Sequence, residues 1–445
     1  MPYLPSLQCS YLLWTCLRQK YNVESHAAQF VVLILPVLAC QTVLADHVQS
    51  VNIALLTACT ALYLTTKTQA AKVEDSRNGS TSKFMNFLSV YRATMMIMTC
   101  IAILAVDFPI FPRRFAKVET FGTSLMDIGV GSFVFSSGVV SGRAYANPSQ
   151  QQKNFFITSF LSSLRSSFAL LTLGFIRLIS TKTVNYQEHN SEYGLHWNFF
   201  FTLGFLPPFT AIAASLSQWI PFSVLALSTA IGYQTILAHG LQEWILNAPR
   251  TDLLSANKEG ICSFLGYFSI FLFGLDAGKL IFSQKLEHTR ILRLVKNHAK
   301  TKSKYGKLII ALAFWSIVYF ALFTIFMSVI DGEGGQQISR RIANLPYIMW
   351  VITFNFGFIL AFVIIDAEFI GNGSGTTVPK LFDAVNANGL LLFLVANLLT
   401  GIINMSIRTL YASYSVSFAV CAIYMFIVTK IGWFLLFNLK FRLKL

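Results

Sequence analysis

Apolar segments long enough to cross a lipid bilayer recur along the whole of this 445-residue chain. A membrane-spanning helix needs about 20 consecutive, mostly apolar residues. In lipid the backbone polar groups find no water, so only helices and closed barrels can span a membrane. Barrel strands would alternate apolar and polar residues, and the segments show no such alternation. The chain is therefore predicted to be an all-α, polytopic transmembrane protein.

The composition supports a membrane protein and argues against nucleic-acid binding. Charged residues make up 12% of the chain and hydrophobic residues 55%, whereas soluble domains carry about 25% charged residues. The net charge of +15 would suggest nucleic acid in a soluble protein. Here the basic residues lie mostly in the loops between apolar segments, as the positive-inside rule describes. The seven cysteines have no metal-binding spacing, and we expect neither a metal nor a resident cofactor.

Thirteen spans are expected, and they form a single membrane domain over residues 1–445. The spans cover residues 3–17, 27–45, 49–66, 86–107, 121–140, 156–180, 197–216, 220–245, 259–280, 308–330, 345–366, 388–407 and 410–438. Lysine and arginine are concentrated in the loops that follow odd-numbered spans, above all in the basic loop 287–307. This asymmetry predicts a lumenal N-terminus and a cytosolic C-terminus. The sequons at Asn78 and Asn372 then face the cytosol, and we expect neither to be glycosylated.

The stretch DFPIFPRRFAKVET, residues 107–120, concentrates charge and proline on the predicted non-cytosolic side. A residue that precedes proline is disfavoured in the helical region, so the span is expected to end at Asp107. A carboxylate at a helix C-terminus meets the negative end of the helix dipole. Burial also disfavours its charged form. Both effects raise its proton affinity, which suits Asp107 to act as a general base at neutral pH.

The segment after Pro112, RRFAKVETF, is predicted to form a short amphipathic helix at the membrane boundary. Arg113 and Lys117 would share one face of this helix, and Phe115 would dip into lipid. Lys117 would then lie near Asp107, where it would orient that carboxylate or stabilise a developing oxyanion. The alternative is a salt bridge with snorkelling arginines that merely anchor the loop.

Several other polar residues are candidates for substrate binding, and each has a plainer alternative role. Asp127 would line the same cavity or serve as a buried hydrogen-bond partner of a neighbouring helix. His189 and His196 would act as general bases or as polar groups at the level of the lipid head groups. The two arginine pairs would clamp a phosphate or anchor the protein at the head groups; they are Arg113 with Arg114, and Arg340 with Arg341.

Five blocks of sequence together resemble a known family. They are AILAVDFPIFPRRFAKVETFGTSLMDIGVGSFVFSSG, YQEHNSEYGLHWNFF, SANKEGICSFLGYFSIFLFG, RRIANLPYIMWVITFN and NANGLLLFLVANLLTGIINMS. In these blocks the chain resembles the fungal type of glycosylphosphatidylinositol (GPI)-anchor inositol acyltransferase. The resemblance implies an endoplasmic-reticulum enzyme with thirteen spans and a lumenal N-terminus.

The same resemblance implies a reaction and two catalytic residues. Members of the family transfer a fatty acyl chain, typically palmitoyl, from acyl-CoA to the inositol 2-hydroxyl of glucosaminyl-phosphatidylinositol. The aspartate and lysine that look catalytic in the family fall here on Asp107 and Lys117. Acyl-CoA and the lipid would be the partners of the protein at a lumenal catalytic face.

Two alternative functions share the many spans and buried charges. A transporter or lipid flippase would typically contain inverted repeats, and none is detected in this sequence. A different membrane acyltransferase would use His189 or His196 as its base. Separate replacement of each histidine distinguishes the second alternative from a mechanism based on Asp107.

Overall fold

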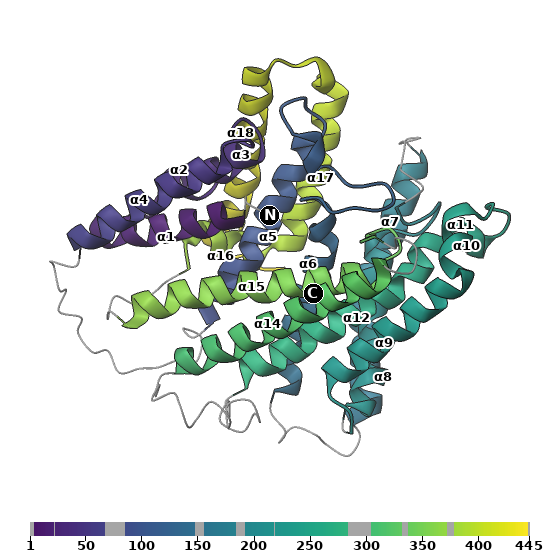
Figure 1. The fold of residues 1–445 in the computed structure, drawn as a ribbon. Coiled ribbons are helices and arrows are strands. Elements are labelled where there is room, and N and C mark those ends of the chain that lie inside the picture. The colour runs from purple at the N-terminus through teal and green to yellow at the C-terminus, as the bar shows by residue number, and fades with distance from the viewer. Residues whose placement is uncertain are drawn as a thin grey trace. The chain divides into compact units, whose positions relative to one another are not determined.

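The computed structural model describes residues 4–21, 23–66, 85–146, 155–183, 192–217, 219–283, 304–331, 337–371 and 378–443. Every regular element in these ranges is a helix (Figure 1). The helices divide into two compact units. The first contains Met1–Ala116 and Phe358–Lys444, and the second contains Lys117–Gly357. The prediction of an all-α protein is confirmed. The sequons at Asn78 and Asn372, His189 and most of the basic loop lie outside the described residues.

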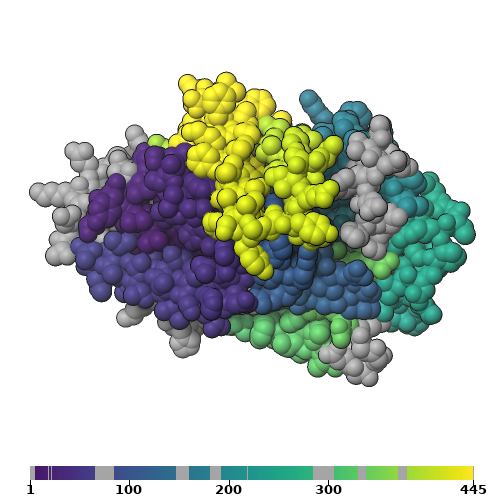
Figure 2. All heavy atoms as spheres, turned by 90° about the horizontal axis from the view of Figure 1, so that it is seen from above, coloured from purple at the N-terminus to yellow at the C-terminus, as the bar shows by residue number. Residues whose placement is uncertain are grey.

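The first unit joins the two ends of the chain. Its N-terminal helices contact α16 and α18, which come from the other end, and in Figures 1 and 2 the purple helices lie beside the yellow ones. The helices of this unit are α1 (Leu4–Tyr21), α2 (His26–Leu33), α3 (Leu35–Gln41), α4 (Val48–Thr66), α5 (Asn86–Ala105), α16 (Lys380–Ala387), α17 (Gly389–Ser406) and α18 (Tyr414–Trp433), with the end of α15 (Leu345–Gly371). Helix α5 packs against α16, α17 and α18, and is therefore central to the unit.

The second unit is built around the long helix α12, which packs against α6, α8 and α9. Its helices are α6 (Asp127–Ser141), α7 (Phe155–Thr183), α8 (Phe199–Leu216), α9 (Phe222–Ile236), α10 (Gln242–Asn247), α11 (Leu253–Ala256), α12 (Lys258–Phe282) and α14 (Lys304–Asp331), with the first part of α15. A π-helical turn, Leu237–Leu241, connects α9 to α10. Helix α7 packs along α8.

Each of the thirteen expected spans corresponds to a helix or a pair of helices, but only ten helices in the described part are long and apolar enough to cross a membrane. The three exceptions are α1, the pair α2–α3 and α6. The pair is interrupted at Ile34, just before Pro36 in the first turn of α3. Helix α6 has 15 residues, because the chain from Phe121 to Met126, expected to be helical, is a loop. The number of spans and the sides on which the termini lie stay predictions.

Helix α5 ends at Ala105 and Asp107 lies in the turn that follows, as the prolines predicted. Asp107 N donates to Leu104 O over 3.1 Å, which closes the last turn. The prediction for the segment after Pro112 was wrong. It forms a single 3-10 turn, Arg113–Phe115, and no amphipathic helix. Phe115 is buried and packs against Phe111. This packing fixes the 3-10 turn within the first unit.

Close contact between α6 and α12 depends on glycine. A Cβ atom at Gly138 would lie 2.3 Å from Phe271 O, and one at Gly274 would lie 2.3 Å from Phe135 O. Both neighbours are backbone atoms, so the helices would have to separate to admit a methyl group. Small residues allow this kind of close approach between membrane helices.

Gly138→Ala is therefore expected to lower the free energy of unfolding by about 1–3 kcal/mol, the usual effect of overpacking. Gly232→Ala in α9 is the matched control, because a Cβ atom there meets nothing within 4 Å. The control should be neutral or slightly stabilising, since alanine favours a helix more than glycine does. Thermal unfolding of the purified proteins in detergent measures both changes. Equal stability of the two variants would contradict the packing argument.

Candidate functional site

Asp107 is a partly buried carboxylate at the end of α5. Asn404 of α17 donates a hydrogen bond from Nδ2 to Asp107 Oδ2 over 2.8 Å. Burial raises the pKa of Asp107 above its usual value, and the hydrogen bond from Asn404 and the charge of Arg113 offset part of this rise. The residue therefore binds a proton more readily than an ordinary aspartate, as a general base near neutral pH requires.

The arginine pair beside Asp107 is engaged within the first unit. Arg113 Nη1 donates to Val106 O over 3.1 Å, at the C-terminal end of α5. Arg114 Nη2 lies 2.5 Å from Asp46 Oδ1 and donates to Ala45 O over 3.1 Å. Both side chains thus tie the segment after α5 to backbone or carboxylate oxygens. Their predicted role as a phosphate clamp stays a prediction.

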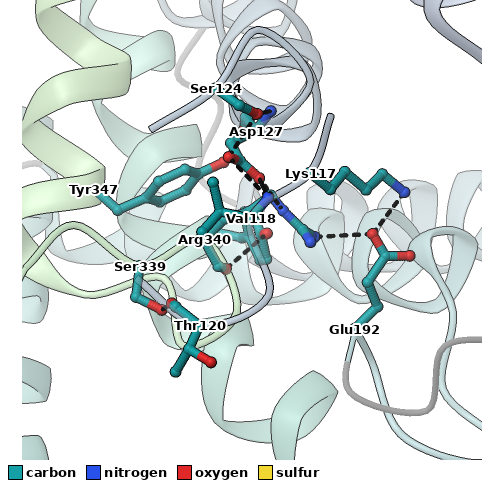
Figure 3. A network of polar contacts seen from close by, with 10 residues as sticks. Lys117, Val118, Thr120, Ser124, Asp127, Glu192, Ser339, Arg340 and Tyr347 are labelled. Carbon is teal, nitrogen blue, oxygen red and sulfur yellow. Dashed lines mark hydrogen bonds and ion pairs between the residues drawn. The ribbon is translucent and has the colours of Figure 1, made fainter. Parts of the chain in front are cut away.

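Asp127 is the centre of a buried polar network in the second unit (Figure 3). Its carboxylate accepts hydrogen bonds from Ser124 Oγ over 2.7 Å and from Val118 N over 3.3 Å. Arg340 Nε donates to Asp127 Oδ1 over 2.8 Å. Tyr347 donates its hydroxyl hydrogen to Asp127 O over 2.9 Å. These are the contacts of a buried hydrogen-bond partner, the plainer of the two roles considered for Asp127.

Arg340 joins two carboxylates. Besides its bond to Asp127, its Nη1 lies 3.1 Å from Glu192 Oε1, and Figure 3 shows the guanidinium between the two acids. Burial lowers the pKa of Arg340, but the surrounding acidic groups, Glu192 foremost and Asp127 among them, together raise the pKa overall. A guanidinium held in this way is a fixed buried charge.

Lys117 continues the same network on the other side of Glu192. Its Nζ lies 2.6 Å from Glu192 Oε1. Burial raises the pKa of Glu192, but the charges of Lys117 and Arg340 outweigh burial and lower it to about 2. Glu192 therefore stays ionised at neutral pH and holds both cations. Lys117 belongs to the second unit and Asp107 to the first, so the expected pairing of their side chains stays a prediction.

Arg341 takes part in a separate cluster around the fully buried Glu259 of α12. Arg250 donates to both carboxylate oxygens of Glu259, over 2.6 and 3.0 Å. Arg341 Nη2 donates to Glu259 Oε1 over 3.0 Å. The two arginines therefore connect the loops that precede α11 and α15 to the start of α12. The neighbouring arginines 340 and 341 serve different carboxylates, so they do not form one bidentate pair in this structure.

His196 lies in the loop before α8 with a partly buried side chain. Its backbone N–H donates to Asn257 Oδ1 over 2.8 Å, and Trp197 N donates to the same oxygen over 2.9 Å. This double contact fixes the loop against the start of α12. Both of these contacts are made by backbone N–H groups. The role of the imidazole as a general base stays a prediction.

The structure joins the candidates in two groups. In the first unit Asp107 lies with Arg113 and Asn404, and in the second unit Asp127, Arg340 and Lys117 are linked through Glu192. Sequence analysis missed Asn404 and gave Glu192 no role. Both occur in the sequence blocks that carry the family resemblance, and these blocks were the only signal that could have identified them.

The chain as a whole is similar to known proteins of one family. The family model described as GWT1 matches residues 3–435. A relative from Yarrowia lipolytica, named GPI-anchored wall transfer protein 1, is 40% identical, and the alignment covers 98% of this chain and 93% of the relative. Proteins of the same name from Gibberella zeae and Candida albicans are 44% and 35% identical. The alignments cover 78% and 94% of this chain, and 72% and 91% of those proteins.

Proposed function

The chain belongs to the GWT1 family, and from this premise we propose that it is an O-acyltransferase of GPI-anchor biosynthesis. The substrates are acyl-CoA, of the palmitoyl type, and glucosaminyl-phosphatidylinositol, which is acylated on the inositol 2-hydroxyl. The names of the relatives refer to GPI anchors, and the ten apolar helices suit an enzyme whose acceptor is a membrane lipid. The observation that carries the proposal is the position of Asp107, a partly buried carboxylate just beyond the end of α5 that accepts a hydrogen bond from Asn404.

The proposed reaction needs a base, a nucleophile and a leaving group. Asp107 takes the proton from the inositol 2-hydroxyl, and the hydroxyl oxygen attacks the carbonyl carbon of the thioester. The resulting tetrahedral intermediate collapses, the carbon–sulfur bond breaks, and the acyl chain stays on the inositol oxygen. Protonated Asp107 returns its proton to the departing thiolate, so CoA leaves as the thiol. The base is regenerated by this step, and no cofactor is consumed.

Lys117 is proposed as the second catalytic residue, on the strength of its match to the family pattern. Its ammonium is held by Glu192 within the second unit. An ammonium fixed by a carboxylate is already oriented and needs little rearrangement to stabilise negative charge on an oxyanion. Its partner Glu192 is itself fixed by Arg340.

We further propose that the protein is a multi-pass protein of the endoplasmic-reticulum membrane with a lumenal catalytic face. The proposal follows the distribution of lysine and arginine between the loops. In this topology Asp107 lies at the lumenal end of α5. The proposed arginine contacts to phosphate, of the lipid or of CoA, would be made on the same side.

The direct test is acyl transfer from palmitoyl-CoA to a synthetic glucosaminyl-phosphatidylinositol by the purified protein in detergent. Formation of free CoA thiol and of the inositol-acylated lipid, in equal amounts, is the expected result. Thiol release without acylated lipid would indicate a hydrolase instead. Absence of both products from a folded preparation that binds the lipid would overturn the proposal and favour the transporter or flippase.

Replacing His196 by Ala separates this mechanism from one that uses a histidine base. The variant is expected to keep its kcat within about threefold of the parent protein, because alanine keeps the backbone N–H groups through which residues 196 and 197 bind Asn257. A lost general base instead lowers the rate by about 10²–10⁴-fold. The measurement is kcat in the acyl-transfer assay, with His189→Ala beside it. A loss of that size in either variant, with the fold intact, would favour the histidine alternative.

A further inference from the structure

In the side-chain amide of Asn404, the nitrogen has a hydrogen-bond partner and the oxygen has none among the described residues. Its Nδ2 donates to Asp107 Oδ2 over 2.8 Å. Its Oδ1 is buried and finds no hydrogen-bond partner among the described residues. An ionised carboxylate only accepts hydrogen bonds, so the amide nitrogen must face Asp107 and the oxygen must point away.

An unsatisfied buried acceptor destabilises a folded protein, and such groups are rare in native structures. A leucine has a similar shape and would remove the unsatisfied oxygen. Asn404 therefore occupies its place in α17 at a cost to stability. The contact that offsets this cost is the bond to Asp107, which points to a role in orienting that carboxylate.

The bond also makes the two carboxylate oxygens unequal. Oδ2 is engaged by Asn404, whereas no hydrogen bond from the described residues reaches Oδ1. A hydrogen bond to the charged form of an acid favours that form and lowers its pKa. The charge of Arg113 also favours the carboxylate. Cys421 of α18 is a further titratable group that faces Asp107, and a thiol is uncharged at neutral pH.

We propose that Asn404 is a positioning residue of the acyltransferase reaction: it holds Oδ2 of Asp107, leaves Oδ1 to receive the proton of the acceptor hydroxyl, and keeps the base ionised. The catalytic part of this inference rests on the proposed function. The orientation and ionisation of Asp107 are properties of the protein itself and can be measured without turnover.

The test compares Asn404→Leu and Asn404→Asp with the parent protein. Leucine removes the donor, so the titration midpoint of Asp107 should move to higher pH. Aspartate adds a second negative charge beside Asp107 and should move the midpoint further in the same direction. Asn397→Leu is the matched control on the same helix, because Asn397 is exposed and its amide bonds to Phe393 O of its own helix.

Two measurements are made on each protein. Infrared difference spectroscopy follows the carboxylic-acid band of Asp107 against pH, with Asp107→Asn as the assignment standard. The acyl-transfer assay gives kcat, KM and the acidic limb of kcat against pH. For Asn404→Leu we expect a kcat lowered by about 10–100-fold at neutral pH, on the scale of a lost hydrogen bond to a charged group. The KM for the lipid should be nearly unchanged, and the melting temperature should be at or above that of the parent.

The possible results separate the inference from the proposed function. An unchanged midpoint and kcat in both Asn404 variants would overturn the inference, even with an inactive Asp107→Asn. A fall in kcat that follows a fall in melting temperature, with the midpoint unchanged, would also overturn it, because a structural role predicts that pattern. If the parent protein transfers no acyl chain, the proposed function fails, and the infrared midpoints still decide whether Asn404 controls Asp107.

Discussion

Asp107→Asn is expected to lower kcat for acyl transfer by about 10²–10⁴-fold, the usual contribution of a positioned general base. Asparagine has nearly the same shape as aspartate, so the turn after α5 should keep its structure. Its side chain cannot accept the proton of the acceptor hydroxyl. The lipid should still bind, because the substitution removes no donor that would contact the phosphate. The loss should therefore appear in kcat and in kcat/KM to a similar extent, with little change in KM.

The control for this variant is Asp383→Asn in α16 of the same unit, where the carboxylate is 41% exposed and 4.0 Å from Arg442. It should keep its full rate. The pH profile of the parent protein gives a second check. Because burial raises the pKa of Asp107, activity should fall as the pH decreases through a midpoint above the usual aspartate value of about 3.9. Full activity of Asp107→Asn would remove this carboxylate from the mechanism.

The lengths of the apolar segments predicted the helices because the length of a membrane helix follows from the thickness of the bilayer. Helices α14 and α15 are uninterrupted, and each was expected from its apolar residues alone. Local rules were less reliable for the effects of proline. Pro36 coincides with an interruption between α2 and α3, whereas Pro207 and Pro208 lie inside α8. Contacts with neighbouring helices determine whether a helix continues through a proline, and a single sequence does not show these contacts.

The site residues were predicted as individual groups, but their partners were not. The pattern of prolines predicted that the helix ends at Asp107, and α5 ends two residues earlier, at Ala105. Arg340 was expected to meet phosphate, yet it binds Asp127, which is 213 positions earlier in the chain. Pairing over such a distance depends on the tertiary fold. Asn404 and Glu192 were missed for the same reason, since an isolated asparagine or glutamate in a loop or helix has no distinguishing pattern.

Phe115 shows why the predicted amphipathic helix does not form. Spacing alone placed this ring on a lipid-facing side. In the structure it is fully buried and packs edge-on against Phe111. Burial of a large apolar side chain contributes about 1.5–3 kcal/mol, which is more than the helical propensity of a nine-residue segment supplies. Tertiary packing therefore overrides the local pattern here.

Arg340→Met is expected to lower the free energy of unfolding by about 3–5 kcal/mol, because it leaves the buried Asp127 without its cation. Methionine fills much of the same volume and keeps the apolar part of the side chain. The side chains of Arg340 and Asp127 are 4% and 1% exposed, so water does not replace the lost partner. Arg114→Met is the comparison: the side chains of Arg114 and Asp46 are 54% and 74% exposed, and an exposed pair contributes only about 0–1 kcal/mol.

A double-mutant cycle then separates the lost ion pair from simple loss of packing. Adding Asp127→Asn to Arg340→Met removes the stranded charge, so the double variant should be more stable than Arg340→Met alone. The coupling between the two residues should reach about 1–3 kcal/mol, as expected for groups in one polar network. Glu192 keeps Lys117 as a partner in every variant of the cycle, so its charge stays compensated. Additive effects in thermal or denaturant unfolding would show that the two side chains are not coupled, and the buried network would then lose its role in holding the loops before α6 and α15 together.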